Sequence, residues 1–371
     1  MSATADHTEK LERVARVAHA AGLRGVLLAG HHNIAWLTGG RANRIDASRE
    51  AGTARLLVAA DGRRFVLANA IEMPRLIGEE LVGLDYQPIE YPWTEDQEPA
   101  RAVRAARSLI GEAAPLGADW PLPDTTSVEA ALSRARSLLT DGDIARYRAL
   151  GRDAGLMLGN VCLALTPGDE ERDIARSIMD GALGMRARPI VTLVGSDERL
   201  RTYRHPVPTA AAWKHVVMVA LCAERDGLVV SLSRMVAAGG PPDLGARTRA
   251  AASVFGRLLD ATRPGATAAS LYAVAADGYA AAGFPGEELK HHQGGAIGYR
   301  AREWVAHPAS QEAVQARQAF AWNPTIAGTK IEDTALVIED RVEILTSTPD
   351  WPVITLGTAQ RPIKASDVWR L

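Results

Sequence analysis

The first 140 residues alternate between helical and strand-like spacing of apolar side chains. Gly22 is placed to end a first helix, and the turn signal Asp61-Gly62 separates two β-rich runs. Helices are predicted at residues 9–21, 101–114 and 128–139. Strands are predicted at residues 25–29, 54–59 and 65–67. This part of the chain therefore reads as an α/β domain that ends near residues 140–143.

The rest of the chain begins with a long helical pattern and ends in strands and turns. Pro167-Gly168 closes the first helix, and Arg225-Asp226-Gly227 joins two strands in a hairpin. Helices are predicted at residues 144–165, from 170 onward, at 246–262 and at 269–282. Strands are predicted at residues 190–194, 215–223 and 228–233, with further strands and turns over 294–354. We predict an α/β (α+β) protein with domains 1–141 and 142–371.

Composition narrows the class of partner. The chain has 371 residues, 47% hydrophobic and 23% charged, with a formal net charge of −2 and no basic stripe. Nucleic acid and membrane surfaces are therefore not expected partners, and a small-molecule substrate is favoured. Cys162 and Cys222 are the only cysteines, which argues against a disulfide framework and a cysteine-based zinc site. The N-terminus lacks the apolar run of a secretory signal, so a cytoplasmic location is expected.

Five short segments carry a family resemblance because they occur in order along the chain. They are 32–39 (HNIAWLTG), 219–234 (VALCAERDGLVVSLSR), 294–298 (GGAIG), 322–324 (WNP) and 330–334 (KIEDT). Together they resemble the pita-bread hydrolases of the peptidase M24 type, the family of creatinase, aminopeptidase P and prolidase. The resemblance covers most of the chain. It implies a creatinase-like N-terminal α/β domain followed by a C-terminal pita-bread domain.

The resemblance also locates the family's metal site. In the family, two aspartates, one histidine and two glutamates hold two divalent ions that activate a water. The matching positions here are Ala220, Ser231, Gly295, Asn323 and Glu332. One carboxylate and one amide cannot neutralise two dications, so the comparison implies no bound metal, and no cofactor is expected. The small residues are expected to leave room where the metals were.

The resemblance to creatinase, which works without metal, points to a histidine as the acid/base. The segment 203–209 (YRHPVPT) matches the creatinase segment that carries its catalytic histidine, and His205 falls on that position. A neutral imidazole can take a proton from water and return it to a leaving nitrogen. The alternative is a loop histidine without a role. The resemblance implies His205 and Glu332 as catalytic residues.

Other candidates are expected to bind substrate. Adjacent strand residues face opposite ways, so at most one of His291 and His292 should point into the site, and His292 is preferred. Nearby glycines either admit a ligand or form a β-bulge. Arg302 either binds a substrate carboxylate or forms an internal ion pair, and Asn323 either faces Glu332 across the site or is a polar core remnant.

The remaining candidates come from the same matched segments. Arg41 and Arg44 are either solvated or reach the site of a partner subunit in a homodimer, as an arginine in this neighbourhood does in creatinase. Ser231 and Tyr203 complete the predicted substrate-binding set. The homodimer would place the partner subunit's N-terminal domain near the site.

The function that the resemblance implies is a metal-independent hydrolase. It would cleave a C–N bond of a small carboxylated amino-acid, guanidino or amide derivative. The alternative is a non-hydrolytic pita-bread protein, either a lyase or cyclase of secondary metabolism or a ligand-binding pseudoenzyme. A third function, a metal-dependent Xaa-Pro aminopeptidase, is opposed by the four replaced ligand positions, Ala220, Ser231, Gly295 and Asn323.

Overall fold

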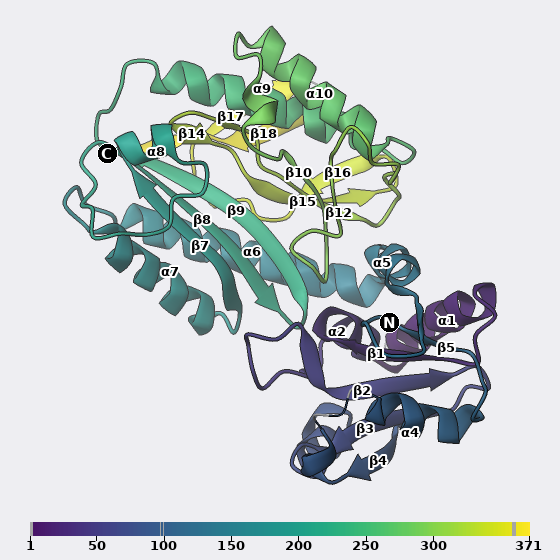
Figure 1. Cartoon of the computed structure of the whole chain (residues 1–371). Coiled ribbons are helices and arrows are strands. Elements are labelled where there is room, and N and C mark those ends of the chain that lie inside the picture. Colours follow the sequence, from purple (N-terminus) through teal and green to yellow (C-terminus); the bar gives the residue numbers. More distant parts are fainter. Residues whose placement is uncertain (1–2, 97, 99, 358–360) are drawn as a thin grey trace. The chain divides into compact units, whose positions relative to one another are not determined.

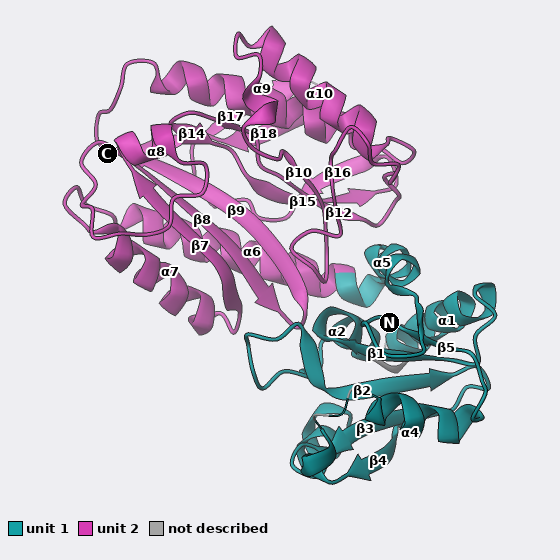
Figure 2. Ribbon diagram, in the orientation of Figure 1, with its two compact units in different colours: residues 1–143 teal, residues 144–371 magenta. Residues whose placement is uncertain are grey.

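The computed structural model describes residues 3–96, 98, 100–357 and 361–371. Two compact units divide the chain, residues 1–143 and residues 144–371 (Figure 2). Helix α6 (Asp141–Leu163) contains residues of both units. No helix within the described residues is long and apolar enough to cross a membrane.

The N-terminal unit is built on a six-stranded sheet with the order β4-β3-β2-β1-β5-β6 (Figure 1). The central strand β1 is buried along its whole length, as its apolar run requires, and pairs antiparallel with β2 and parallel with β5. The strands are β1 (Gly25–Gly30), β2 (Ala51–Ala59), β3 (Arg64–Asn69), β4 (Gln87–Tyr91), β5 (Leu116–Ala118) and β6 (Thr126–Ser127). This unit contains all three strands predicted from the first 140 residues.

Helices of the N-terminal unit include one that the spacing of apolar residues did not predict. Helix α2 follows β1 directly and ends at Gly39, whose φ of 75° is the left-handed C-cap conformation that glycine adopts without strain. The helices are α1 (Ala3–Ala20), α2 (His31–Thr38), α3 (Met73–Arg75), a π-helix (Leu76–Glu80), a 3-10 turn (Trp93–Glu95), α4 (Arg101–Ile110) and α5 (Glu129–Ser137). The apolar face of α4 packs on the sheet through Val103 and Ala106.

The C-terminal unit contains two larger sheets, each accompanied by a pair of helices (Figure 1). One sheet has the order β19-β9-β8-β7 and the other β11-β10-β12-β15-β16. The helices are α6, α7 (Glu171–Gly184), α8 (Glu198–Thr202), α9 (Leu244–Ala261), α10 (Ala268–Ala281) and a 3-10 turn, η3 (Glu287–Leu289). An isolated bridge between Ser233 and Glu332 connects the two sheets.

The strands of this unit are mostly antiparallel. The first sheet contains β7 (Arg188–Ser196), β8 (Val216–Arg225), β9 (Leu228–Ala237) and β19 (Val368–Arg370). The second contains β10 (Gly294–Ile297), β11 (Trp304–Val305), β12 (Ala319–Trp322), β15 (Asp333–Ile338) and β16 (Arg341–Ile344). Two short ribbons are formed by β13 (Thr325–Ile326) with β14 (Thr329–Lys330), and by β17 (Val353–Gly357) with β18 (Pro362–Ser366).

The β8–β9 hairpin confirms the turn predicted from sequence. Arg225 pairs with Leu228, and the two residues between them, Asp226 and Gly227, have φ of 52° and 78°. Positive φ at both central positions defines a type I′ turn, which matches the twist of the flanking strands. In the register that this turn fixes, Ala220 lies opposite Ser233 and Cys222 opposite Ser231, so these four side chains share one face.

The main core of the C-terminal unit lies between helices α9 and α10 and the second sheet. Phe255, Leu258 and Tyr279 of the helices pack with Phe320 and Trp322 of β12, all fully buried. The indole nitrogen of Trp322 donates to the Thr262 hydroxyl at 3.0 Å, so the largest side chain of this core has a satisfied donor. A rigid core of this kind holds the strands and loops that carry the candidate site.

Candidate functional site

His205 lies in the loop between α8 and β8, and buried contacts hold this loop in place. The Glu171 carboxylate accepts hydrogen bonds from the backbone nitrogen of Thr209 at 2.9 Å and from its hydroxyl at 2.7 Å. Arg199 binds the same carboxylate at 3.1 Å and the Val207 carbonyl at 2.7 Å. Glu171 is fully buried, so the loop around His205 is fixed rather than free in solvent.

An ion pair connects the His205 loop to the segment that carries the second group of histidines. Arg204 donates to Glu287 at 2.5 Å, and both side chains are largely buried. Glu287 opens the 3-10 turn η3, which ends just before His291. His205 follows Arg204 directly, and His291 stands four positions after Glu287. The ion pair therefore helps to bring the two histidines together, although they are 86 positions apart in sequence.

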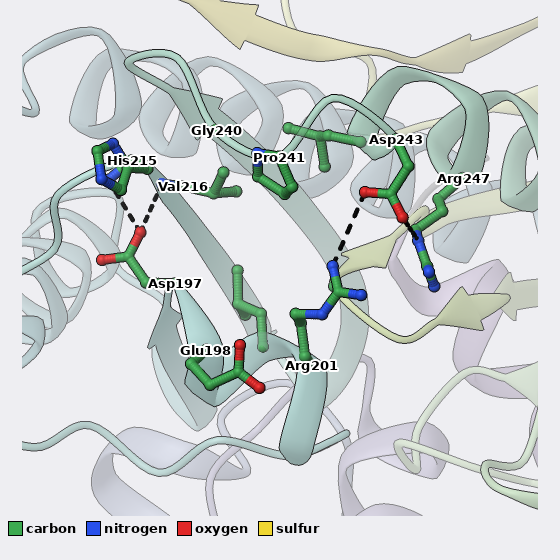
Figure 3. A pocket seen from close by; sticks show the side chains of 12 residues that line it. Asp197, Glu198, Arg201, His215, Val216, Gly240, Pro241, Asp243 and Arg247 are labelled. Carbon is green, nitrogen blue, oxygen red and sulfur yellow. Dashed lines mark hydrogen bonds and ion pairs between the residues drawn. The ribbon is translucent and has the colours of Figure 1, made fainter.

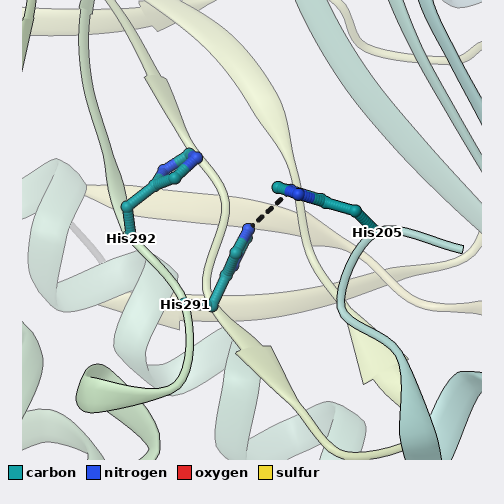
Figure 4. Close-up of side chains that lie close together, drawn as sticks. All are labelled: His205, His291 and His292. Carbon is teal, nitrogen blue, oxygen red and sulfur yellow. Dashed lines mark hydrogen bonds between the residues drawn. The ribbon is translucent and has the colours of Figure 1, made fainter.

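Three imidazoles form a cluster at this point (Figure 4). The Nε2 atoms of His205 and His291 lie 3.0 Å apart, with the ring planes nearly perpendicular. The His292 ring centroid lies 4.6 Å from that of His291 and 6.0 Å from that of His205. The expectation that only one of His291 and His292 faces this site is wrong, because both precede β10 and do not follow strand alternation.

Burial and neighbouring cations keep the three imidazoles neutral. Burial and then Lys330 lower the pKa of His291 to about 2. Burial and then Arg302 lower the pKa of His292 to about 4. Burial and then Lys330 also lower the pKa of His205. At neutral pH each ring therefore has one unprotonated nitrogen that can accept a proton or bind a metal.

Glu332 is buried beside two cationic side chains. The Lys330 Nζ lies 2.8 Å from its carboxylate, the Ser231 hydroxyl donates to it at 2.7 Å, and an Arg302 nitrogen lies 3.9 Å away. Burial raises the pKa of Glu332, but Lys330, Arg302 and these hydrogen bonds outweigh it and lower the pKa to about 2. Lys330 was not among the predicted site residues, although it stands two positions before Glu332 in the retained segment.

The expected room at two of the replaced positions is filled. Ala220 belongs to an apolar cluster with Leu200 and Met218. A Cβ at Gly295 would lie 2.1 Å from the carbonyl oxygen of Trp304 in β11, so the neighbouring backbone occupies the space of a side chain. Gly295 is required by the close approach of two strands, and neither a β-bulge nor a ligand is needed to explain it.

Asn323 and Arg302 each have a buried polar atom without a partner within the described part of the chain. These atoms are Oδ1 of Asn323 and Nε of Arg302. The backbone nitrogen of Asn323 donates to the Gln293 carbonyl at 3.0 Å, and no hydrogen bond joins its side chain to Glu332 within the described residues. Whether Asn323 faces Glu332 across the site or is a polar core remnant stays a prediction. One buried acceptor and one buried donor therefore have no hydrogen-bond partner within the described residues.

Three predicted binding residues are not members of the histidine cluster. Tyr203 is exposed, and the Arg199 guanidinium lies 5.4 Å from its ring centre. Arg41 is exposed and Arg44 is partly buried, and both follow helix α2 in the N-terminal unit. Their contact with a partner subunit's site, and the homodimer itself, remain predictions.

A cavity of about 430 Å³ lies near the start of β8 and α9 (Figure 3). Two of its carboxylates, those of Asp243 and Asp197, have ion-pair or hydrogen-bond partners. Asp243 pairs with Arg247 at 2.6 Å and with Arg201 at 3.8 Å. Asp197 accepts hydrogen bonds from three successive backbone nitrogens, those of residues 214–216.

The histidine cluster is the group of side chains within the described residues that could hold a metal. The ligand nitrogens of His205, His291 and His292 all lie within 4.8 Å of one another. Zinc binds imidazole nitrogen at roughly 2.0–2.1 Å. The hydrogen bond between His205 and His291 joins their two Nε2 atoms. An ion bound through both of these atoms would replace this hydrogen bond.

Residues 145–344, more than half of the chain, match the model of metallopeptidase family M24. The chain belongs to metallopeptidase family M24. No curated protein matches it. Of the solved structures, a dipeptidase PepE from Mycobacterium ulcerans is 21% identical to this M24 chain, with a TM-score of 0.76 and coverage of 93% of this chain and 97% of that one.

Two further solved structures share the architecture of this M24 protein. The prolidase from Pyrococcus horikoshii OT3 is 18% identical, with a TM-score of 0.76 and coverage of 92% of this chain and 98% of that one. The X-Pro aminopeptidase from Thermotoga maritima is 15% identical, with a TM-score of 0.73 and coverage of 97% and 99%. The predicted α/β fold, a creatinase-like N-terminal domain followed by a pita-bread domain, is confirmed.

Proposed function

We propose that this M24 protein hydrolyses a C–N bond of a small carboxylated amino-acid, guanidino or amide derivative without a two-metal centre. The observation that carries the proposal is the 2.8 Å pairing of Glu332 with Lys330. Glu332 is the only carboxylate at the five positions that match the family's ligands, and Arg302 adds a second positive charge. Two dications need several anionic oxygens, and here they would meet cations and one carboxylate that is already neutralised.

His205 is the proposed general acid/base. Its pKa is lowered by burial and by Lys330, so the ring is ready to accept a proton at neutral pH. It would take a proton from the attacking water and deliver that proton to the leaving nitrogen. The ring is exposed, whereas its hydrogen-bonded neighbour His291 is only 8% exposed. The reacting nitrogen can therefore meet solvent and substrate while its partner stays fixed.

The charges around the site support a carboxylated substrate. Lys330 and Arg302 are cationic, Glu332 is anionic and the three histidines are neutral, which leaves one net positive charge. The buried Nε of Arg302 has no partner among the described residues, and its guanidinium can bind a carboxylate through two parallel hydrogen bonds. The Oδ1 of Asn323, which also lacks a partner there, can accept a hydrogen bond from an amide or guanidinium N–H. These two groups would orient opposite ends of one small molecule.

The experiment measures turnover after metal removal. Chelator-treated protein is assayed with guanidino acids, N-carbamoyl and N-acyl amino acids and Xaa-Pro dipeptides, and its metal content is determined by elemental analysis. We expect turnover without stoichiometric metal, and a loss of roughly 10²–10⁴-fold in kcat for His205→Ala. His307→Ala, in an exposed loop, is the matched control and should leave turnover unchanged. Activity that disappears with chelator and returns with manganese or cobalt would contradict the proposal.

A second function, ligand binding without hydrolysis, has one specific observation in its favour. The N-terminal domain of FACT complex subunit SPT16 from Cicer arietinum is 11% identical to this chain, with a TM-score of 0.69 and coverage of 92% of this chain and 97% of that one. The name of that protein does not describe a hydrolase. Ligands that raise the melting temperature without being consumed, and a His205→Ala variant that still binds them, would favour this second function.

A further inference from the structure

The hydrogen bond between His205 and His291, drawn in Figure 4, is one link in a longer chain of four groups. The Nδ1 atom of His291 lies 3.0 Å from the Thr325 hydroxyl oxygen. That hydroxyl donates to the carbonyl oxygen of Asn323 at 2.9 Å. The chain thus runs from an exposed imidazole through a buried one to a backbone carbonyl, which can only accept hydrogen bonds.

The last member of this chain determines where each proton lies. The Thr325 hydroxyl has a single proton, and it is given to the Asn323 carbonyl. The oxygen of Thr325 must then accept a proton from Nδ1 of His291. A neutral imidazole has only one N–H, so Nε2 of His291 carries a lone pair. That lone pair can accept only from Nε2–H of His205, and the basic nitrogen of His205 is then Nδ1.

The surroundings of His291 keep this arrangement rigid. Thr325 is 6% exposed, and its backbone nitrogen donates to the Tyr279 hydroxyl at 2.8 Å. The Tyr279 hydroxyl donates to the Gln293 side chain at 2.6 Å, and the Gln293 amide in turn donates to the His291 carbonyl. Both the ring and the backbone of His291 are therefore held. Burial and Lys330 lower the pKa of His291 to about 2, which keeps a second proton off this ring.

We propose that His291 and Thr325 are positioning residues that hold His205 as its Nε2–H tautomer, so that Nδ1 of His205 performs the proton transfer. The tautomer follows from the hydrogen bonds alone, whereas the catalytic consequence rests on the proposed function. Nδ1 takes one proton from water as the water oxygen bonds to the substrate carbon. The C–N bond breaks with its electron pair on nitrogen, and that nitrogen receives the proton from Nδ1. The ring then returns to the Nε2–H tautomer.

The hydrogen bond between His205 and His291 also strengthens during this step. During the reaction His205 becomes an imidazolium, whose Nε2–H is a stronger donor than that of the neutral ring. The Nε2 lone pair of His291 accepts this bond, and the connected Thr325 hydroxyl and Asn323 carbonyl polarise in the same direction. The same four groups would therefore fix the resting tautomer and stabilise the charged intermediate state.

The tautomers can be read directly from nitrogen NMR of the full chain labelled with ¹⁵N-histidine, at neutral pH and with chelator present. Long-range proton–nitrogen spectra distinguish protonated from unprotonated ring nitrogens, and His205→Ala and His291→Phe assign the signals. We expect Nε2–H for His205 and Nδ1–H for His291. Thr325→Val, which removes the hydroxyl and keeps the shape, should mix the tautomers of both rings. Thr325→Ser should restore them, and His307→Ala should leave both rings unchanged.

The opposite tautomers, or a Thr325→Val spectrum identical to wild type, would overturn the proposal. One equivalent of Zn²⁺ shifting all three histidines of the cluster in chelator-free buffer, together with turnover that requires it, would also overturn it in favour of a metal site. For kinetics we expect Thr325→Val to lower kcat with little change in KM, and Thr325→Ser to recover it. Expected tautomers in a protein that hydrolyses nothing would separate failure of the proposed function from failure of this inference.

Discussion

Glu332 and Asp333 are neighbours in sequence and both are buried beside cationic side chains, yet their environments differ. Lys330 lies 2.8 Å from Glu332, and Arg234 lies 3.0 Å from Asp333. Burial raises the pKa of both carboxylates. For Glu332 the nearby cations outweigh burial and lower the pKa to about 2, whereas burial prevails at Asp333 and the pKa is raised.

The difference lies in what each cation does besides neutralising its carboxylate. Arg234 also donates to the backbone carbonyls of Ser233 and Thr346 and to the Thr348 hydroxyl, so it ties several segments of the core together. Glu332 instead has two cations near it and faces the region of the histidines, whose pKa values it helps to set. Asp333 therefore stabilises the fold, and Glu332 belongs to the candidate site.

The largest expected effect comes from breaking the structural pair. Arg234→Met leaves Asp333 as a buried carboxylate without its cation and also removes the bonds to the surrounding carbonyls. We expect the free energy of unfolding to fall by about 3–5 kcal/mol in chemical denaturation. Arg152→Met, at an arginine that is 71% exposed, is the control and should change stability by less than about 0.5 kcal/mol. Equal changes in the free energy of unfolding for the two variants would contradict the structural role given to Arg234.

The stability of the fold at acid pH distinguishes the two carboxylates, because their pKa values are shifted in opposite directions. The folded pKa of Glu332 is about 2 against an ordinary 4.5, so its ionised form stabilises the fold above pH 4.5. This contribution, on the order of 3 kcal/mol, is lost as the pH falls from 4.5 toward 2. The raised pKa of Asp333 acts in reverse, since that contribution is present below the ordinary value of 3.8 and is lost as pH rises through the folded pKa.

Denaturation measured at a series of pH values tests both signs. In Glu332→Gln the fall in stability between pH 4.5 and 2 should be smaller than in wild type, because the titrating group is gone. In Asp333→Asn the corresponding fall should be steeper, because a contribution that favours the fold at acid pH has been removed. If both variants change the acid dependence in the same direction, the assigned environments are wrong.

Sequence reasoning predicted those features that depend on neighbours along the chain. The Asp226-Gly227 turn was predicted because local chemistry selects a type I′ turn. His205 and Glu332 were proposed from matched segments, and their catalytic roles remain predictions. The contact of His205 with His291 was not predicted, because it joins positions 86 residues apart through the packing of two loops.

Other features of the site depended on tertiary contacts in the same way. The fit of Gly295 against the Trp304 carbonyl depends on the pairing of β10 with β11, which the glycine-rich segment does not specify. Lys330 was missed because a lysine in a strand segment is ordinarily solvated, and only the buried Glu332 beside it makes it part of the site. The presence of both His291 and His292 in the cluster was not predicted, because strand alternation was applied to residues that precede the strand.

The smallest expected effect distinguishes two serines on one face of β9. The Ser231 hydroxyl donates to Glu332 at 2.7 Å, whereas the buried Ser233 hydroxyl has no partner within the described residues. Ser231→Ala should cost about 1 kcal/mol and raise the pKa of Glu332, because the carboxylate loses a donor. Ser233→Ala removes an unsatisfied group and should be neutral or slightly stabilising. The free energy of unfolding of both variants is measured by chemical denaturation. A larger decrease for Ser233→Ala than for Ser231→Ala would contradict the stabilising role given to the hydrogen bond between Ser231 and Glu332.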